Sequence, residues 1–173
     1  MHYVELNGKH VSVDAGAGHQ KQMVEENFGG DFYAMAELYF SSFSNIAKKT
    51  DADIIGHFDL VAKYNQGGCL FDESHPRYVA AALSAIDEIL KDCKLFEVNT
   101  GAMFRYNRTQ PYPSVFLLEE LLKRGGEVIL SSDSHEAGSL YFNFDEMQEL
   151  LKSCGFAHIK RLTKSGFIDV PLY

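Results

Sequence analysis

Short apolar segments alternate with helical ones along most of the chain, and this alternation constrains the fold more than any other feature. The apolar segments centre near residues 54, 96, 128 and 158, and a helical segment separates each one from the next. Repeated strand–helix units imply parallel strands, because the chain crosses back through a helix before the next strand pairs. The sequence therefore predicts an α/β fold with a parallel sheet.

Turn and capping residues set the expected boundaries of these elements. Apolar runs predict strands at 9–13, 53–56, 95–99, 127–131, 157–162 and 167–170. Helical spacing predicts helices at 20–27, 31–48, 76–92, 113–125 and 145–155. Asp31 and Asp145 are the expected N-caps of their helices, and segments 57–73, 100–112 and 133–143 are expected to be loops.

The length and composition indicate one globular domain over 1–173, since 46% of the 173 residues are hydrophobic and 23% are charged. The three cysteines form no CxxC pair, so neither a disulfide framework nor a thiolate zinc site is expected. No apolar run reaches transmembrane length, and the first ten residues lack the apolar core of a signal peptide. We therefore expect a soluble, cytoplasmic protein.

The charge balance narrows the classes of partner. Sixteen basic and twenty-four acidic residues give a net charge of −8. Nucleic acids and anionic membranes both require a basic face, so neither is an expected partner. A phosphorylated small molecule needs only one local basic pocket and remains compatible with this charge.

Polar side chains suited to chemistry follow three consecutive predicted strands. They are His57 and Asp59, then Glu97 and Asn99, then Asp133 and His135. Because parallel strands deliver their carboxyl ends to one edge of a sheet, these groups are expected to gather there. The same edge receives the loop that carries Arg105 and Arg108, and arginine binds phosphate through a planar fork of donors. The alternative for both arginines is the solvated state usual for loop residues.

The Asp133-x-His135 pair is suited to a metal, since carboxylate oxygen and imidazole nitrogen are ligands for zinc, manganese and iron. The alternative is that Asp133 caps a turn and His135 is an ordinary surface residue. His57 follows Gly56 and can approach a cavity closely, or it can be a buried histidine bonded to a carbonyl. No GxSxG, GxxxxGK[ST] or GxGxxG motif is present, so serine-triad, nucleotide and dinucleotide chemistry are not indicated.

Four segments, in their order and spacing, resemble the PHP family (polymerase and histidinol phosphatase), in its histidinol-phosphatase branch. They are MHYVELNGKHVSVD, DIIGHFDLVAKYN, FEVNTGAMFRYNRTQPYPS and VILSSDSH, and the resemblance runs from His2 to about Phe167. The resemblance implies a distorted (β/α)7 TIM-like barrel with three metals at the strand ends. This chain looks like a C-terminal, partial barrel domain, because the family's N-terminal His-x-His motif is absent.

The resemblance also implies roles for particular residues. His2 and His57 look like ligands of one metal, Asp133 of a second and His135 of the third, with Zn, Mn or Fe as the metals. Arg105 and Arg108 look like phosphate anchors. Asp133 and His135 are the implied catalytic residues, with a metal-bound hydroxide attacking phosphorus. Only part of this trinuclear centre is present, and the missing strands predict self-association through an exposed strand edge.

The expected function is that of a metal-dependent phosphomonoesterase that hydrolyses L-histidinol phosphate to L-histidinol in histidine biosynthesis. One alternative is a truncated, inactive PHP fragment that serves only as a structural or binding module. The other is a PHP phosphatase with another small phosphorylated substrate, such as a nucleotide or a sugar phosphate. Metal content and phosphate release distinguish these alternatives.

Overall fold

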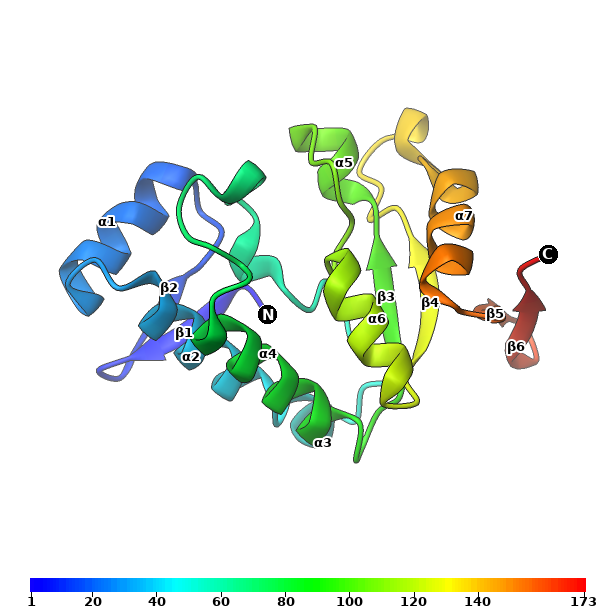
Figure 1. Cartoon of the computed structure of the whole chain (residues 1–173), viewed down its shortest axis with the longest axis horizontal. Helices are drawn as coiled ribbons and strands as arrows, with labels where there is room; N and C mark the ends of the chain where they lie inside the picture. The colour runs from blue at the N-terminus through cyan, green and yellow to red at the C-terminus, as the bar shows by residue number, and fades with distance from the viewer. The chain divides into compact units, whose positions relative to one another are not determined.

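The computed structural model describes residues 1–173 and divides the chain into two units (Figure 1). The first unit comprises residues 1–52 and 59–92, and the second comprises 53–58 and 93–173. Each unit has its own core and is described by itself. The single partial barrel domain over the whole chain stays a prediction.

The first unit consists of an antiparallel β-hairpin followed by four α-helices and two short 3-10 turns. Its elements are β1 (Tyr3–Leu6), β2 (Lys9–Ser12), α1 (Ala17–Phe28), α2 (Phe32–Phe43), α3 (Ile46–Thr50), the 3-10 turns η1 (Leu60–Ala62) and η2 (Gln66–Gly68), and α4 (Pro76–Ile89). β1 and β2 pair in antiparallel fashion with Tyr3 opposite Ser12. The strand expected at 9–13 is therefore confirmed, whereas the strand before it was missed.

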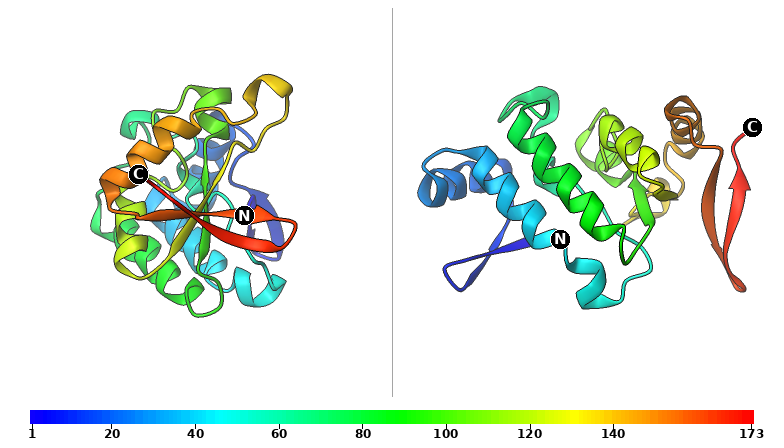
Figure 2. Two further views of the ribbon diagram at one scale, coloured as in Figure 1. Left: turned by 90° about the vertical axis from the view of Figure 1, so that its right-hand side faces the viewer. Right: turned by 60° about the horizontal axis from the view of Figure 1, so that its bottom comes forward.

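The core of the first unit lies between α2 and α4, which run side by side in Figure 2. Tyr39 and Phe40 of α2 and Tyr78 of α4 are completely buried. The Phe40 and Tyr78 rings meet edge to face, with centroids 5.4 Å apart. Burial of an aromatic face of this kind is the main stabilising contribution to such a helix pair.

The boundaries of α2 show one correct and one wrong prediction. Asp31 is the N-cap, and its Oδ1 accepts from the N–H groups of Tyr33 and Ala34. The helix predicted through residue 48 instead ends at Phe43, and α3 begins at Ile46. The break falls at Ser44 and Asn45, residue types that favour local hydrogen bonds over a continuous helix.

The second unit is built on a four-stranded sheet in the order β3-β4-β5-β6. Its elements are β3 (Leu95–Asn99), α5 (Gly101–Tyr106), α6 (Val115–Lys123), β4 (Glu127–Ser131), the 3-10 turn η3 (Ala137–Ser139), α7 (Phe144–Cys154), β5 (His158–Thr163) and β6 (Gly166–Pro171). β3, β4 and β5 are parallel, and β6 returns antiparallel to β5. The predicted α/β fold with parallel strands is therefore confirmed.

The segment predicted as a strand at 53–56 makes one parallel bridge, between Ile55 and Phe96. This bridge places the residue after Gly56 beside the end of β3. The core of the unit is formed by completely buried apolar side chains of the sheet and its helices, namely Phe96, Val98, Leu117, Leu118, Leu121 and Leu151.

Two predictions for this unit are wrong. The segment 100–112 is not a loop throughout, because α5 forms within it immediately after β3. Asp145 lies inside the first turn of α7, while Asn143 occupies the N-cap position with φ of 57°. An acidic residue in the first turn still stabilises the helix through its dipole. No helix of the chain is both long enough and apolar enough to cross a membrane.

Candidate functional site

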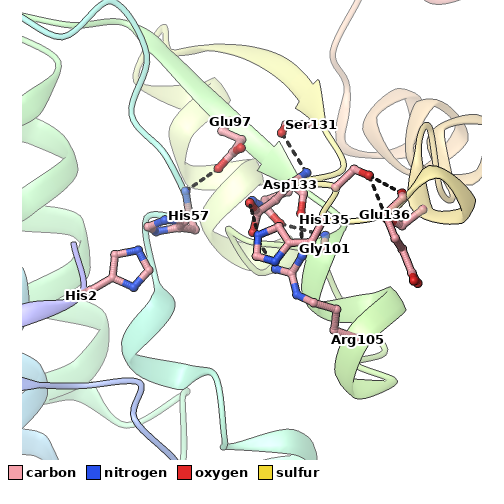
Figure 3. A network of polar contacts seen from close by, with 12 residues as sticks. His2, His57, Glu97, Gly101, Arg105, Ser131, Asp133, His135 and Glu136 are labelled. Atoms are coloured by element: carbon pink, nitrogen blue, oxygen red, sulfur yellow. Dashed lines mark hydrogen bonds and ion pairs between the residues drawn. The ribbon is translucent and has the colours of Figure 1, made fainter.

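The candidate site lies at the carboxyl ends of the strands of the second unit. His57 follows Ile55, the residue that bridges to β3. At the ends of the next two strands, β3 leads into α5 and β4 leads into the segment that carries Asp133 and His135. Figure 3 shows Glu97, Asp133 and Arg105 at this edge. Of the predicted groups, His57, Glu97, Asn99, Asp133 and His135 belong to the second unit, whereas the buried Asp59 belongs to the first.

His57 adopts a conformation that few non-glycine residues use, with φ of 28°. Its main-chain N–H donates to Oε2 of Glu97, at 2.8 Å. The preceding residue, Gly56, also packs against this carboxylate, since a Cβ at Gly56 would lie 3.4 Å from Oε2 of Glu97. The half-buried carboxylate of Glu97 therefore positions the turn that presents the His57 imidazole.

Asp133 also has a positive φ, of 45°, and its N–H donates to the hydroxyl of Ser131 at 3.2 Å. Its Oδ1 lies 3.5 Å from Nε2 of His135. The His135 side chain is 71% exposed, so this imidazole is accessible to a ligand. Positive φ is uncommon at non-glycine residues, although Asp adopts it more readily than most.

Arg105 is bound to Asp133 twice. Its Nη1 donates to the main-chain carbonyl of Asp133 at 2.5 Å, and its Nη2 donates to Oδ2 at 2.6 Å. Both bonds depend on Gly101, because a Cβ there would lie 2.8 Å from Nη2 of Arg105 and 2.8 Å from the carbonyl oxygen of Ser132. The Gly101 N–H in turn donates to Oδ1 of the buried Asn99 at 2.8 Å, so Asn99 shapes this turn.

A pocket of about 260 Å³ opens beside this pair. It is lined by Phe104, Arg105, His135, Glu136 and Ser139. The pocket thus combines a guanidinium, an imidazole and a carboxylate with one aromatic ring. A cation and a proton-carrying ring beside a small pocket suit an anionic ligand such as a phosphate group.

Arg108 is not in the solvated state that was the alternative to its predicted phosphate role. It is 7% exposed, and its guanidinium carbon lies 4.5 Å from the centroid of the Tyr112 ring. Its Nε is 3.5 Å from the carbonyl oxygen of Gln110. The structure therefore places this guanidinium against an aromatic face, and its phosphate role stays a prediction.

His2 belongs to the first unit, where it pairs with Asp14. Its Nδ1 lies 2.9 Å from Oδ2 of Asp14, and Nζ of Lys63 lies 3.3 Å from the same oxygen. Burial raises the pKa of Asp14, but the hydrogen bond with His2, the charge of Lys63 and the hydrogen bond from Ser12 together lower it more, so the pKa lies below its usual value. No role was predicted for Asp14 from the sequence, although it is the last residue of the segment MHYVELNGKHVSVD.

The predicted ligands His2, His57, Asp133 and His135 have the atom types that a divalent metal binds, but too few of them converge. Imidazole nitrogens and a carboxylate oxygen suit zinc, manganese or iron, and His2 has the carboxylate partner typical of a ligating histidine. Within this chain, however, no group of three or more His, Cys, Asp or Glu side chains is arranged to hold an ion.

Comparisons with known proteins identify relatives of the chain, although no family model matches it. It is 28% identical over 134 residues to a "Probable histidinol-phosphatase" of Schizosaccharomyces pombe, covering 73% of this chain and 41% of that protein. A protein with the same name in Deinococcus radiodurans is 30% identical over 134 residues, covering 76% of this chain and 45% of that one. The chain thus spans less than half the length of these two relatives.

A solved structure shares the fold. The "putative histidinol phosphatase hisK" of Listeria monocytogenes aligns with a TM-score of 0.72 at 17% identity, covering 84% of this chain and 55% of that one. The fold is therefore that of an α/β protein like this neighbour. The sequence matches identify the relationship more narrowly than the fold does. They relate the chain to the histidinol-phosphatase branch of the PHP family, as its motifs predicted.

Proposed function

We propose that this chain is part of a metal-dependent phosphomonoesterase that hydrolyses L-histidinol phosphate to L-histidinol in histidine biosynthesis. The observation that carries the proposal is the pocket of about 260 Å³, which is lined by Arg105 and His135. Asp133 holds Arg105 in place by a hydrogen bond. The relationship to proteins named as histidinol-phosphatases supports the choice of substrate.

Arg105 is the proposed phosphate anchor. Its guanidinium lines the pocket and is oriented by two hydrogen bonds to Asp133. A phosphate group in the pocket would accept from the remaining N–H groups of this fork, which has five donors in all. Arg108 is a second proposed anchor, and its contact with Tyr112 would have to be shared or released for that role.

His2, His57, Asp133 and His135 are the residues that would hold divalent Zn, Mn or Fe. When bound, such metals activate water as a nucleophile and stabilise charge on the phosphoryl oxygens. The exposed His135 is placed to give or take a proton at Nε2, which lies 3.5 Å from Oδ1 of Asp133. Ligands outside this chain, from a longer protein or a second copy, would complete the centre.

The second unit is further proposed to be a portion of a distorted (β/α)7 barrel. The parallel strands β3, β4 and β5 and the likeness to a solved structure of greater length support this architecture. In such a barrel the site residues would face the open end formed by the carboxyl ends of the strands.

The direct test measures phosphate released from histidinol phosphate by the purified chain with Mn²⁺ or Zn²⁺ in excess. Phosphate release that depends on metal supports the proposal. Arg105→Ala should then raise the KM for substrate and the inhibition constant of inorganic phosphate by about 10- to 100-fold, as expected for a lost charged hydrogen bond. Arg161→Ala, a change of an exposed arginine on β5, is the matched control and should leave both constants unchanged.

A second candidate function is favoured by the small number of converging donors. Because no three such side chains gather in this chain, it could serve as a structural or binding module without turnover. Absence of both bound metal and phosphate release, in a chain that is folded by circular dichroism, would support the module. Turnover of a nucleotide or sugar phosphate in preference to histidinol phosphate would instead identify a phosphatase of another specificity.

We also propose that the chain self-associates through an exposed strand edge, and β6 is one end strand of its sheet. An end strand presents unpaired N–H and C=O groups that a second copy can complete. Ile168 is 45% exposed and Phe167 is 39% exposed, so an apolar surface accompanies this edge.

A further inference from the structure

We infer that Asp14 is a positioning residue that holds His2 in its Nδ1–H tautomer and thereby presents Nε2 as the ligand nitrogen. The inference rests on the proposed function for the role of His2, but its physical basis lies entirely in the first unit. Nothing in the sequence motifs marked Asp14 for this role.

The ammonium group of Lys63 determines which residue donates and which accepts in the His2–Asp14 hydrogen bond. Two nitrogen atoms lie within hydrogen-bond distance of Oδ2 of Asp14: Nδ1 of His2, at 2.9 Å, and Nζ of Lys63, at 3.3 Å. An ammonium group only donates, and a carboxylate paired with it only accepts. The proton of the His2–Asp14 bond therefore belongs to Nδ1, which makes Nε2 the nitrogen with the lone pair.

The backbone holds the two residues together. The hairpin pairing of β1 and β2 continues one step beyond Tyr3 and Ser12, because the N–H of Val13 donates to the carbonyl of His2 at 2.9 Å. This places Asp14 one residue past the partner of His2. The carboxylate thus reaches the imidazole from a neighbouring strand end.

Asp14 is itself fixed by its surroundings. The hydroxyl of Ser12 donates to Oδ1 at 3.1 Å, and the hydroxyl of Tyr64 donates to the main-chain carbonyl at 2.6 Å. The side chains of Asp14 and Lys63 are only 15% and 13% exposed, whereas that of His2 is 50% exposed. A nearly buried, fully bonded carboxylate behind an exposed imidazole is the arrangement that orients a ligating histidine.

The tautomer can be measured without metal or substrate. In the full chain labelled with ¹⁵N-histidine, at a pH where His2 is neutral, long-range ¹H–¹⁵N spectra distinguish a protonated from an unprotonated ring nitrogen. We expect His2 to show a protonated Nδ1 in the wild type. In Asp14→Ala, which removes the acceptor, the signal should move toward the Nε2–H form that free side chains favour. Asp14→Asn retains an amide oxygen that can accept from Nδ1–H and should keep more of the Nδ1–H form than Asp14→Ala does.

Two controls accompany this measurement. His158, whose Nε2 lies 3.5 Å from Asp169 in the second unit, should keep its signals in both variants. Glu5→Ala, a change of an exposed residue on β1, should leave the His2 signals unchanged. A wild-type His2 in the Nε2–H form, or no change in the Asp14→Ala variant, would overturn the inference.

A titration with Zn²⁺ alone separates this inference from the proposed function. If His2 is a ligand, Asp14→Ala should weaken Zn²⁺ binding by about 10- to 100-fold, the loss typical for an outer-shell partner, and Glu5→Ala should not. A wild-type chain that binds no Zn²⁺ would count against the proposed function, while the tautomer would still decide the role of Asp14. Zn²⁺ binding that His2→Ala weakens and Asp14→Ala leaves unchanged would contradict the inference alone.

Discussion

The main-chain N–H of His57 donates to Oε2 of Glu97 at 2.8 Å, although the two residues are 40 positions apart in the chain. This bond joins the turn after Ile55 to the middle of β3. It also compensates for the φ of 28° at His57, a type of backbone strain that costs about 1–3 kcal/mol. The candidate site is therefore held by a carboxylate that bonds to backbone rather than to a ligand.

Replacement of Glu97 tests this compensation. Glu97→Ala should lower the free energy of unfolding by about 1–3 kcal/mol, because the half-buried His57 N–H loses a charged acceptor. Glu97→Gln retains an amide oxygen that can accept the same bond and should recover most of that loss. Urea unfolding measures both, with the exposed Glu119→Ala on α6 as control. Equal stability of Glu97→Ala and the wild type would show that the bond does not support the turn.

Gly101 is expected to tolerate no side chain. In Gly101→Ala the new Cβ would lie 2.8 Å from both the Ser132 carbonyl oxygen and Nη2 of Arg105, so one of them must move. We expect a loss of about 1–3 kcal/mol in the free energy of unfolding, as for other overpacked sites. Gly138→Ala is the matched control, since nothing lies within 4 Å of its Cβ position. A variant as stable as the control would mean that the Arg105–Asp133 pair shifts at no cost.

Arg77 makes the stability of the first unit depend on pH. It bridges Asp31, with Nη1 at 2.7 Å from Oδ2, and Glu37, with Nη2 at 2.7 Å from Oε2. Hydrogen bonds from Arg77 lower the pKa of both carboxyls below their usual values. A lowered folded-state pKa gives stability that is present above the unfolded-state pKa and is lost as the pH falls through the folded-state value.

Arg77→Gln should therefore destabilise the chain at pH 7 and have a smaller effect at pH 3, because protonation of these carboxyls in the unfolded chain removes part of the stability that the ion pairs contribute. Thermal unfolding at the two pH values, followed by circular dichroism, measures the difference. Lys91→Gln, which removes an exposed pair with Glu88 on the same unit, serves as control. An Arg77→Gln effect of the same size at both pH values would contradict a role through the two carboxylates.

Self-association through β6 predicts a mass that depends on concentration. Light scattering coupled to size exclusion should show more than one chain per particle at high concentration. Ile168→Lys should shift the distribution toward one chain, because a charged side chain on an end strand opposes pairing between copies. Tyr3→Lys, at a 57% exposed position in the first unit, should have no effect. A wild-type mass of one chain at all concentrations would rule out this association.

Elements set by local pattern were the ones predicted from sequence. The bounds of β3 and β4 match the predicted strands, because short apolar runs between a helix and a polar turn leave few alternatives. Asp31 was correctly identified as an N-cap, whereas the N-cap of α4 was not. That cap is His75, whose Nδ1 accepts from the N–H of Arg77 at 3.2 Å while its ring stacks on Tyr33, with centroids 3.9 Å apart. Histidine carries no strong capping signal, so only the hydrogen bond from the Arg77 N–H in the structure reveals its role.

The order of residues along the chain determined the parallel strands and the kinds of group at their ends, since strand–helix alternation leaves one edge of the sheet for His57, Asp133 and Arg105. It could not determine which of those groups bond to each other. Only the tertiary structure shows that Arg105 is held by Asp133 and that Asp14 pairs with His2. These partners are distant in sequence, and their contacts depend on side-chain directions and backbone angles that no local pattern encodes.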